Sequence, residues 1–270
     1  MKARRRLDIE FLLGAVGLAA LFLTSFLVPL LSPFDPLRGE SSALLAPSGE
    51  HPFGTDNLGR DIFVRSFAAL QLDFVLAIIA VTASLVIGST IGALMGMWRN
   101  SWISRILTLF VDSVNAFPFI VLALGIVAVV GPSAPGVVAA IVLTGWARYA
   151  RIARARALVV AGSDFVSASR LLGFGRARII RRHVFPNVYA ESLAFALSEL
   201  VVVIIMIASL SFLGAGVRPP TAELGAMISE GRLYLTTAWW MTVIPGAILA
   251  ITALCIQFVA EGYERMRKDV

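Results

Sequence analysis

The sequence contains very few of the residues that build metal, nucleotide and disulfide sites. It has two histidines and one cysteine in 270 residues, and its only lysines are Lys2 and Lys268. Cys255 alone excludes an intrachain disulfide framework. No G-x-x-x-x-G-K-[ST] motif occurs, which excludes a P-loop, and no H-E-x-x-H motif or Ser/His arrangement indicates catalysis. We therefore expect no catalytic residue, no metal site and no cofactor bound by this chain.

What the sequence has in abundance is apolar side chains. It is 58% hydrophobic and 15% charged, with a mean hydropathy of +0.85, far above an ordinary soluble domain. Five runs are long enough to cross a bilayer as helices, and a shorter sixth at residues 137–147 precedes a cluster of arginines. The five are residues 11–31, 74–97, 106–130, 192–213 and 239–259. The prediction is an all-α polytopic membrane protein with six transmembrane helices.

The distribution of positive charge predicts the orientation. With the N-terminus in the cytoplasm, the inner segments carry 18 lysines and arginines and the outer segments carry 5. The positive-inside rule favours this arrangement, with both termini cytoplasmic. Contact with anionic headgroups explains the basic composition better than nucleic acid does. The run after "MKARRR" is long and lacks a cleavage site, so we expect an uncleaved anchor.

The connection after the first apolar run, residues 32–73, is rich in proline and glycine. It holds six acidic residues against three arginines, which predicts a water-facing outer loop. We divide the chain into residues 1–50, which comprise the tail, the first transmembrane helix and the start of this loop, and residues 51–270, a core with five transmembrane helices.

A polar segment, "SDFVSASRLLGFGRARIIRRHVFPN" (163–187), interrupts the apolar pattern on the cytoplasmic side. Ser163 can cap a helix whose first turn carries Asp164. Helical spacing gives this helix a narrow apolar face. Glycines 173 and 175 break the helix, and a second short helix follows that Pro186 is expected to end. The face comprises Phe165, Ala168, Ser169 and Leu172.

These residues resemble the EAA motif of the permease subunits of bacterial ABC importers. Ala168, Gly173 and Pro186 stand at the motif's small, glycine and proline positions, whereas Ser167 stands where the family often has glutamate. Other stretches are similar to the second permease subunit of the dipeptide, oligopeptide and nickel branch. They are "HPFGTDNLGRDIF" (51–63), "WARYARIAR" (146–154), "DFVSASRLLG" (164–173), "RHVFPN" (182–187) and "SFLGAGVRPPTAELGAMISEGRLYL" (211–235).

The resemblance implies a type I importer permease core in which the loop 163–187 couples transport to ATP. ATP and Mg would be used by two partner ATPase subunits. The other implied partners are a second homologous permease, an extracytoplasmic substrate-binding protein and membrane lipids, without nucleic acid. The implied coupling residues are Asp164, Ala168, Ser169, Arg170, Gly173, Arg182, His183 and Pro186.

Charged and polar residues inside a bilayer normally face protein or water. Asp112, Asn115 and Glu199 fall within predicted spans and are candidates for the wall of a translocation path; hydrogen bonds to neighbouring helices are the alternative. The predicted outer loop after residue 213 offers candidate contacts for a docked binding protein, the alternative being a cap over the helix ends. These candidates are Arg218, Glu223, Glu230 and Arg232.

The resulting hypothesis is half of the translocation path of an ATP-driven importer in the bacterial inner membrane. Di- and oligopeptides are the expected cargo, and nickel or a nickel chelate is the alternative within the same branch. A membrane-embedded enzyme or a self-gated channel is the alternative from another class. Such a protein would be active alone, whereas a permease would not be.

Overall fold

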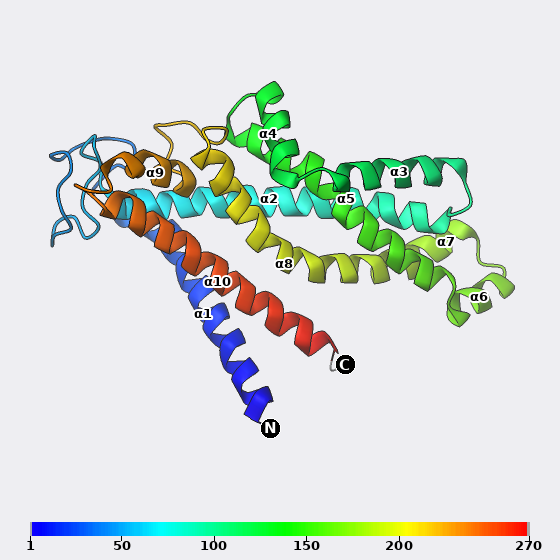
Figure 1. Cartoon of the computed structure of the whole chain (residues 1–270). Coiled ribbons are helices and arrows are strands. Elements are labelled where there is room, and N and C mark those ends of the chain that lie inside the picture. The colour runs from blue at the N-terminus through cyan, green and yellow to red at the C-terminus, as the bar shows by residue number, and fades with distance from the viewer. Residues whose placement is uncertain (1, 269–270) are drawn as a thin grey trace.

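The computed structural model describes residues 2–268, and the described residues form helices joined by short connections and one long loop (Figure 1). The predicted all-helical class is confirmed. In chain order the elements are α1 (Lys2–Leu31), α2 (Ile62–Met97), α3 (Trp102–Ala116), α4 (Phe119–Val130), α5 (Ala134–Ala161), α6 (Asp164–Leu171), α7 (Arg176–Ile179), the π-helical turn η1 (Ile180–Val184), α8 (Phe185–Phe212), α9 (Leu224–Gly231), the 3-10 turn η2 (Arg232–Tyr234) and α10 (Trp240–Lys268).

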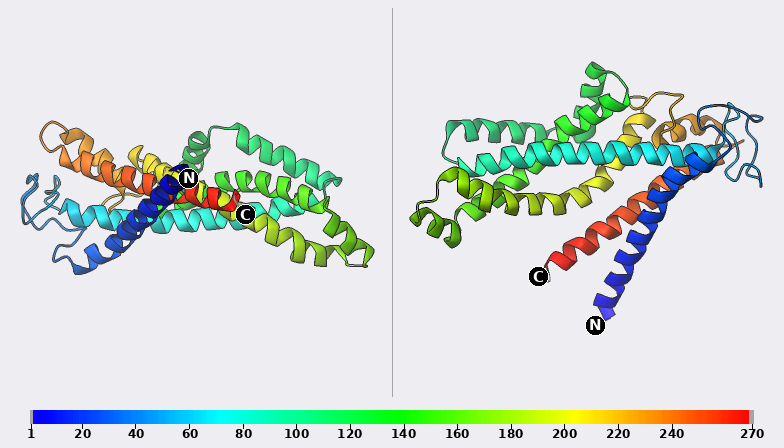
Figure 2. Two further views of the ribbon diagram at one scale, coloured as in Figure 1. Left: turned by 90° about the horizontal axis from the view of Figure 1, so that it is seen from below. Right: turned by 180° about the vertical axis from the view of Figure 1, so that it is seen from behind.

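Helix α2 runs the length of the molecule, and α5 and α8 pack along it. The long loop and α9 lie at one end, which we call the loop end, and α6 and α7 lie at the other, the arginine-rich end (Figure 1). Helices α1 and α10 lie side by side and diverge from α2 toward the two termini (Figure 2).

In the part of the chain that the structure describes, five helical segments are long and apolar enough to cross a membrane, and α3 with α4, bent by 97°, makes a sixth if the pair crosses as one span. The single span expected at residues 106–130 is therefore corrected to two helices. Pro118 is responsible, because it disfavours helical geometry in the residue before it. Phe117 is accordingly extended, with φ −80° and ψ 143°.

The short apolar run at 137–147 is part of the 28-residue helix α5, which confirms that a membrane helix lies there. One side of the arginine-bearing half of α5 is buried, and this side is made of alanines. They are Ala147, Ala150, Ala153 and Ala157, all fully buried. The arginines project from its other sides.

Glycines spaced four residues apart let α2 and α5 approach closely. A Cβ atom on Gly88 would overlap the carbonyl oxygen of Trp146, and one on Gly92 would overlap that of Ala150. Small residues at this spacing are the usual device by which membrane helices bring their backbones together. The α2–α5 contact therefore holds the centre of the molecule.

Candidate functional site

Helix α6 begins directly after α5, at Ser163. Ser163 occupies the N-cap position, but its hydroxyl donates to the carbonyl oxygen of Val160 at 2.6 Å and makes no capping bond. The predicted capping role of its side chain is therefore wrong. Asp164 lies exposed in the first turn, where its charge suits the positive helix end.

Helix α6 is rotated about its axis relative to the prediction, so different side chains point inward. Val166 and Ser169 point inward, with exposures of 0% and 7%, and Val166 packs in a cluster with Ile179 and Val184. The Ser169 hydroxyl donates to the carbonyl oxygen of Phe165 at 2.8 Å. Ser169 is thus an internal packing residue in this structure. The expectation that it lies on the outer face with Phe165 and Ala168 is wrong.

An exposed ridge of apolar side chains runs along the outer face of α6. It comprises Phe165, Ala168, Leu171 and Leu172, and Leu171 and Leu172 are 90% and 75% exposed. Large apolar side chains gathered on a surface mark an interaction site or a membrane contact. We call these four residues the α6 ridge.

Gly173 ends α6 in a left-handed conformation, with φ +80°. The N–H of Gly173 donates to Arg170 O, and the N–H of Phe174 donates to Ser169 O, at 3.0 and 3.1 Å. These two bonds form a Schellman motif, in which glycine is the preferred residue at the left-handed position. The turn therefore fixes the direction in which the chain leaves α6.

From Arg176 the chain continues without interruption through α7, η1 and α8 to Phe212. The expectation that Pro186 ends a short helix is therefore wrong. Pro186 lies in the first turn of α8, and the π-helical turn before it lets the Phe185 N–H reach back to Ile180 O. A π turn spaces the backbone more widely than an α turn, which accommodates the proline within a continuous helix.

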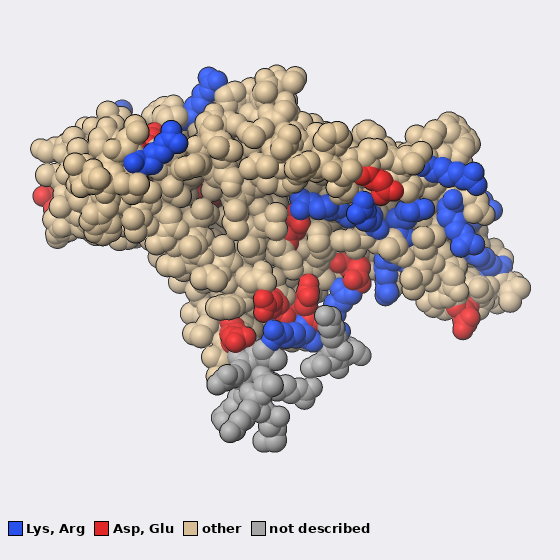
Figure 3. All heavy atoms as spheres, viewed as in Figure 1, with Lys and Arg blue, Asp and Glu red and all other residues tan. Residues whose placement is uncertain are grey.

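Positive charge surrounds this loop. Lys and Arg side chains gather toward the arginine-rich end in the space-filling view (Figure 3). Arg170 and Arg182 are exposed, whereas the half-buried His183 ring lies 5.6 Å from the Phe165 ring of α6. His183 therefore lies beside Phe165 of the α6 ridge.

Inside the spans, Glu199 of α8 is buried and forms an ion pair with Arg148 of α5 at 2.5 Å. Arg148 also lies over the Phe119 ring, 4.3 Å from its centroid. About 20 Å of helix separates Glu199 from Phe212. The pairing places Glu199 in contact with a neighbouring helix, which was the alternative to a free acidic group lining a path.

Asp112 and Arg151 form a second pair at 3.0 Å, and both side chains are more than half exposed. Asn115 donates to Val111 O of its own helix at 2.8 Å. Exposed charges on a membrane helix require water or another protein beside them. The roles of Asp112, Asn115 and Glu199 in a translocation path remain predictions.

The loop predicted at residues 32–73 ends at Asp61, where α2 begins, and its residues 37–40 and 45–50 are exposed as expected. The loop end also contains a buried ionic network. Asp56 pairs with Arg60 at 2.6 Å and with Arg65 at 3.4 Å, and Arg60 reaches Glu230 at 3.3 Å. The Asp56, Arg60 and Arg65 side chains are 2% to 5% exposed. The network ties the long loop to α2 and α9, and the domain boundary placed after residue 50 falls within this folded loop.

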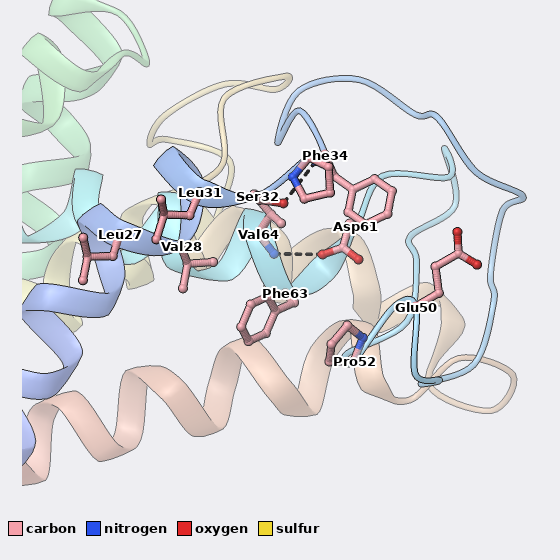
Figure 4. Close-up of a pocket in the computed structure, with 11 residues that line it drawn as sticks. Leu27, Val28, Leu31, Ser32, Phe34, Glu50, Pro52, Asp61, Phe63 and Val64 are labelled. Atoms are coloured by element: carbon pink, nitrogen blue, oxygen red, sulfur yellow. Dashed lines mark hydrogen bonds between the residues drawn. The ribbon is translucent and has the colours of Figure 1, made fainter.

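Asp61 organises the start of α2. One carboxylate oxygen accepts from the Val64 N–H at 2.9 Å, and the other lies 2.7 Å from His51 Nδ1. Between this turn and the end of α1 lies an apolar groove of about 400 Å³, lined by Leu27, Leu31 and Phe63 among others (Figure 4). These roles of Asp56, Arg60 and Asp61 were not predicted from the sequence, although their close spacing in "TDNLGRD" was a usable signal.

The four candidate docking residues have different surroundings. Arg218 and Arg232 are exposed, and Glu230 is partly exposed within the network. Glu223 is fully buried and caps α9, accepting from the N–H groups of Gly225 and Ala226 at 3.0 and 2.7 Å. Its burial raises the pKa of its carboxyl group, and the expectation that its side chain contacts a docked protein is not met in this structure.

Comparison with known proteins gives consistent results. Residues 88–268 match the family described as binding-protein-dependent transport system inner membrane component. A putative peptide transport system permease protein of Brucella suis biovar 1 is 36% identical over 96% of this chain and 86% of its own length. A dipeptide transport system permease protein of Alkalihalophilus pseudofirmus is 33% identical over 93% of this chain and 83% of its own. A glutathione transport system permease protein of Pectobacterium atrosepticum is 32% identical over 96% and 87%.

Solved structures share the fold at lower sequence identity. An amino acid ABC transporter with histidines superposes with a TM-score of 0.58 at 22% identity, covering 75% of this chain and 94% of that chain. The MetNI methionine ABC transporter in an inward-facing conformation gives a TM-score of 0.59 at 18% identity, covering 73% and 94%.

Proposed function

The chain belongs to the family of binding-protein-dependent transport system inner membrane components, and from this premise we propose that it forms half of the translocation path of an importer for di- and oligopeptides. It is a multi-pass inner-membrane permease of the ABC importer type. It is not an enzyme, because ATP hydrolysis in this family takes place on separate ATPase subunits. The named peptide, dipeptide and glutathione permeases among its relatives support the cargo class.

The α6 ridge is the observation that carries the mechanism. It presents exposed apolar side chains at the arginine-rich end, and the Schellman turn at Gly173 connects it to the continuous helix that ends at Phe212. A groove on an ATPase subunit would bury the ridge, and exposed Arg182 would pair with acidic residues at its rim. ATP-driven closure of the ATPases would then move α8.

The proposed assembly contains this chain, a second homologous permease, two ATPase subunits and an extracytoplasmic binding protein. The exposed pair Asp112–Arg151 supports a second permease, because these charges need protein or water beside them in a bilayer. In this assembly the arginine-rich end and both termini face the cytoplasm, and the loop end faces the binding protein. ATP and Mg are held by the ATPases.

The ion pair inside the membrane bears on which class of cargo this chain can carry. Arg148 neutralises Glu199, so no isolated acidic group of this pair is available to hold a cation. This favours a zwitterionic peptide over a free nickel ion as cargo. A nickel chelate, whose charge is already satisfied, is the second candidate.

The test is substrate-stimulated ATP hydrolysis and peptide uptake by the reconstituted complex carrying Ala168→Glu. Ala168 lies on the exposed ridge, and a charge buried there without a partner costs several kcal/mol. We expect stimulated hydrolysis and uptake to fall together by at least about tenfold.

The matched control is Ser167→Glu, which adds the same charge at the adjacent exposed position where the resembling family often has glutamate. It should retain most activity. If Ala168→Glu assembles in the membrane and transports like the unaltered chain, the ridge is not the coupling element and the proposal fails.

A further inference from the structure

A second cavity lies at the arginine-rich end, apart from the α6 ridge. It has a volume of about 520 Å³, within the range of pockets that bind small molecules. Its wall is built from the turn between α2 and α3 on one side and from α6 and α7 on the other. Its lining includes Trp98, Arg99, Ser101, Arg170, Phe174 and Arg176.

Three arginines make this cavity strongly positive. Arg99, Arg170 and Arg176 reach it from three different segments, and none of them takes part in the ion pairs of the residues that the structure describes. The lining segments 97–101 and 170–180 contain no acidic residue. The cavity therefore has guanidinium groups to offer an anion and no carboxylate of its own to occupy them.

The start of α3 adds to this preference. Ser101 is the N-cap of this 15-residue helix and accepts from the Ser104 N–H at 3.1 Å. The remaining N–H groups of the first turn, together with the helix dipole, favour an anion at this position. The Ser104 hydroxyl donates to Met95 O at 2.9 Å, which fixes the turn against α2.

The side chains around the mouth indicate a membrane interface. Trp98 is 45% exposed and Trp102 is 70% exposed, and Ile103 and Ile106 beyond them are more than half exposed. Exposed tryptophans beside exposed aliphatic side chains are typical of the boundary between hydrocarbon and headgroups. The cavity therefore opens beside a surface of the kind found at this boundary. The α6 ridge lies on a different face of α6.

We propose that this cavity binds the phosphate group of an anionic phospholipid, with Arg99, Arg170 and Arg176 as its ligands. Guanidinium groups pair with phosphate through two parallel hydrogen bonds, and this geometry suits a phosphate better than a single ammonium would. A lipid held there joins the α2–α3 turn to the loop 163–187. The inference is independent of the cargo.

The experiment uses the complete transporter in nanodiscs of phosphatidylcholine, with or without phosphatidylglycerol, and native mass spectrometry of the lipids retained after release. The pocket variant is Arg99→Gln/Arg176→Gln. The control is Arg105→Gln/Arg181→Gln, which removes the same charge from exposed positions that do not line the cavity. We expect the pocket variant alone to lose tightly held phosphatidylglycerol, with an apparent affinity reduced about tenfold or more.

A parallel arm adds inorganic phosphate to the transporter in phosphatidylcholine alone and measures thermal stability. Stabilisation by phosphate that requires Arg99 and Arg176, without retention of phosphatidylglycerol, overturns the lipid assignment in favour of a soluble phosphate compound. Equal loss of phosphatidylglycerol in the pocket and control variants contradicts a lipid site in this cavity. A pocket variant that keeps its lipid but releases the ATPases also contradicts it.

If the pocket variant does not assemble, the unaltered complex decides. Photoactivatable phosphatidylglycerol should then crosslink to residues 97–101 or to residues 170–180. Crosslinking that is confined to other segments contradicts the proposal.

Discussion

Gly173 shows how one backbone angle can determine the direction of a functional element. Its φ of +80° lies in the left-handed region, and no atom within 4 Å would obstruct a side chain there. Any cost of substitution therefore arises from the backbone alone. The left-handed conformation costs a residue with a Cβ about 1 kcal/mol or more.

We predict that Gly173→Ala loosens α6 and weakens ATP-stimulated transport, whereas Gly175→Ala does neither. Gly175 also has open space around it, but its φ is −64°. Hydrogen exchange of the α6 amides should quicken only in Gly173→Ala. Equal protection in both variants would show that the Schellman turn does not hold α6 in place.

A buried carboxyl group at the loop end gives stability a defined dependence on pH. Burial raises the pKa of Glu223 above that of an ordinary glutamate. Between the two pKa values the folded chain keeps a proton that the unfolded chain releases, so stability falls as pH rises through this window.

The prediction is that the melting temperature of the purified chain decreases as pH rises above about 4.3, the ordinary glutamate value. Glu223→Gln mimics the protonated state and should flatten this decrease. The Glu230→Gln variant, whose group is partly exposed, serves for comparison. An unchanged slope in Glu223→Gln would rule out Glu223 as the titrating group.

At the scale of elements, the packing of α2 on α5 depends on the absence of side chains. Gly92 faces the carbonyl oxygen of Ala150 and the Ala153 methyl group, whereas Gly125 of α4 has nothing within 4 Å. We predict that Gly92→Ala costs about 1–3 kcal/mol through overpacking and that Gly125→Ala is neutral or stabilising. Thermal unfolding in detergent compares the two, and equal melting temperatures would contradict close α2–α5 packing.

Hydrophobicity predicted where membrane helices lie, because burial in lipid requires long apolar runs. It did not predict the bend at Pro118 or the continuous helix through Pro186, since both depend on how the backbone adjusts around a proline. The loop-end network was missed because Arg60 and Glu230 are 170 residues apart in the chain. Composition alone placed Arg60 in a water-facing loop, and Glu230 was expected to contact a docked binding protein.

The short helix and glycine turn of residues 164–173 lie where the sequence predicted them, but the side chains of α6 were not all assigned to the right face. Helical spacing placed Ser169 outside, whereas packing of Val166 against Ile179 and Val184 turns it inward. A helix of eight residues is too short for its pattern alone to fix its rotation.

For the whole molecule, the proposed orientation gives two surface positions that should differ in access. In a Cys255→Ala background, Arg38→Cys at the loop end should react with an impermeant maleimide in intact cells. Arg105→Cys at the arginine-rich end, outside the α6 ridge, should react only after permeabilisation. Both side chains are exposed, so a reversed pattern would invert the topology.

We expect the continuous helical stretch from Arg176 to Phe212 to act as a mechanical lever. Its 37 residues extend for about 55 Å at the rise of an α-helix. If one end of this stretch is fixed, a tilt of the helix by roughly 5° moves its other end by about 5 Å, given this length. A small displacement of this helix beside the α6 ridge would thus move its other end, across the bilayer, by about the width of a side chain.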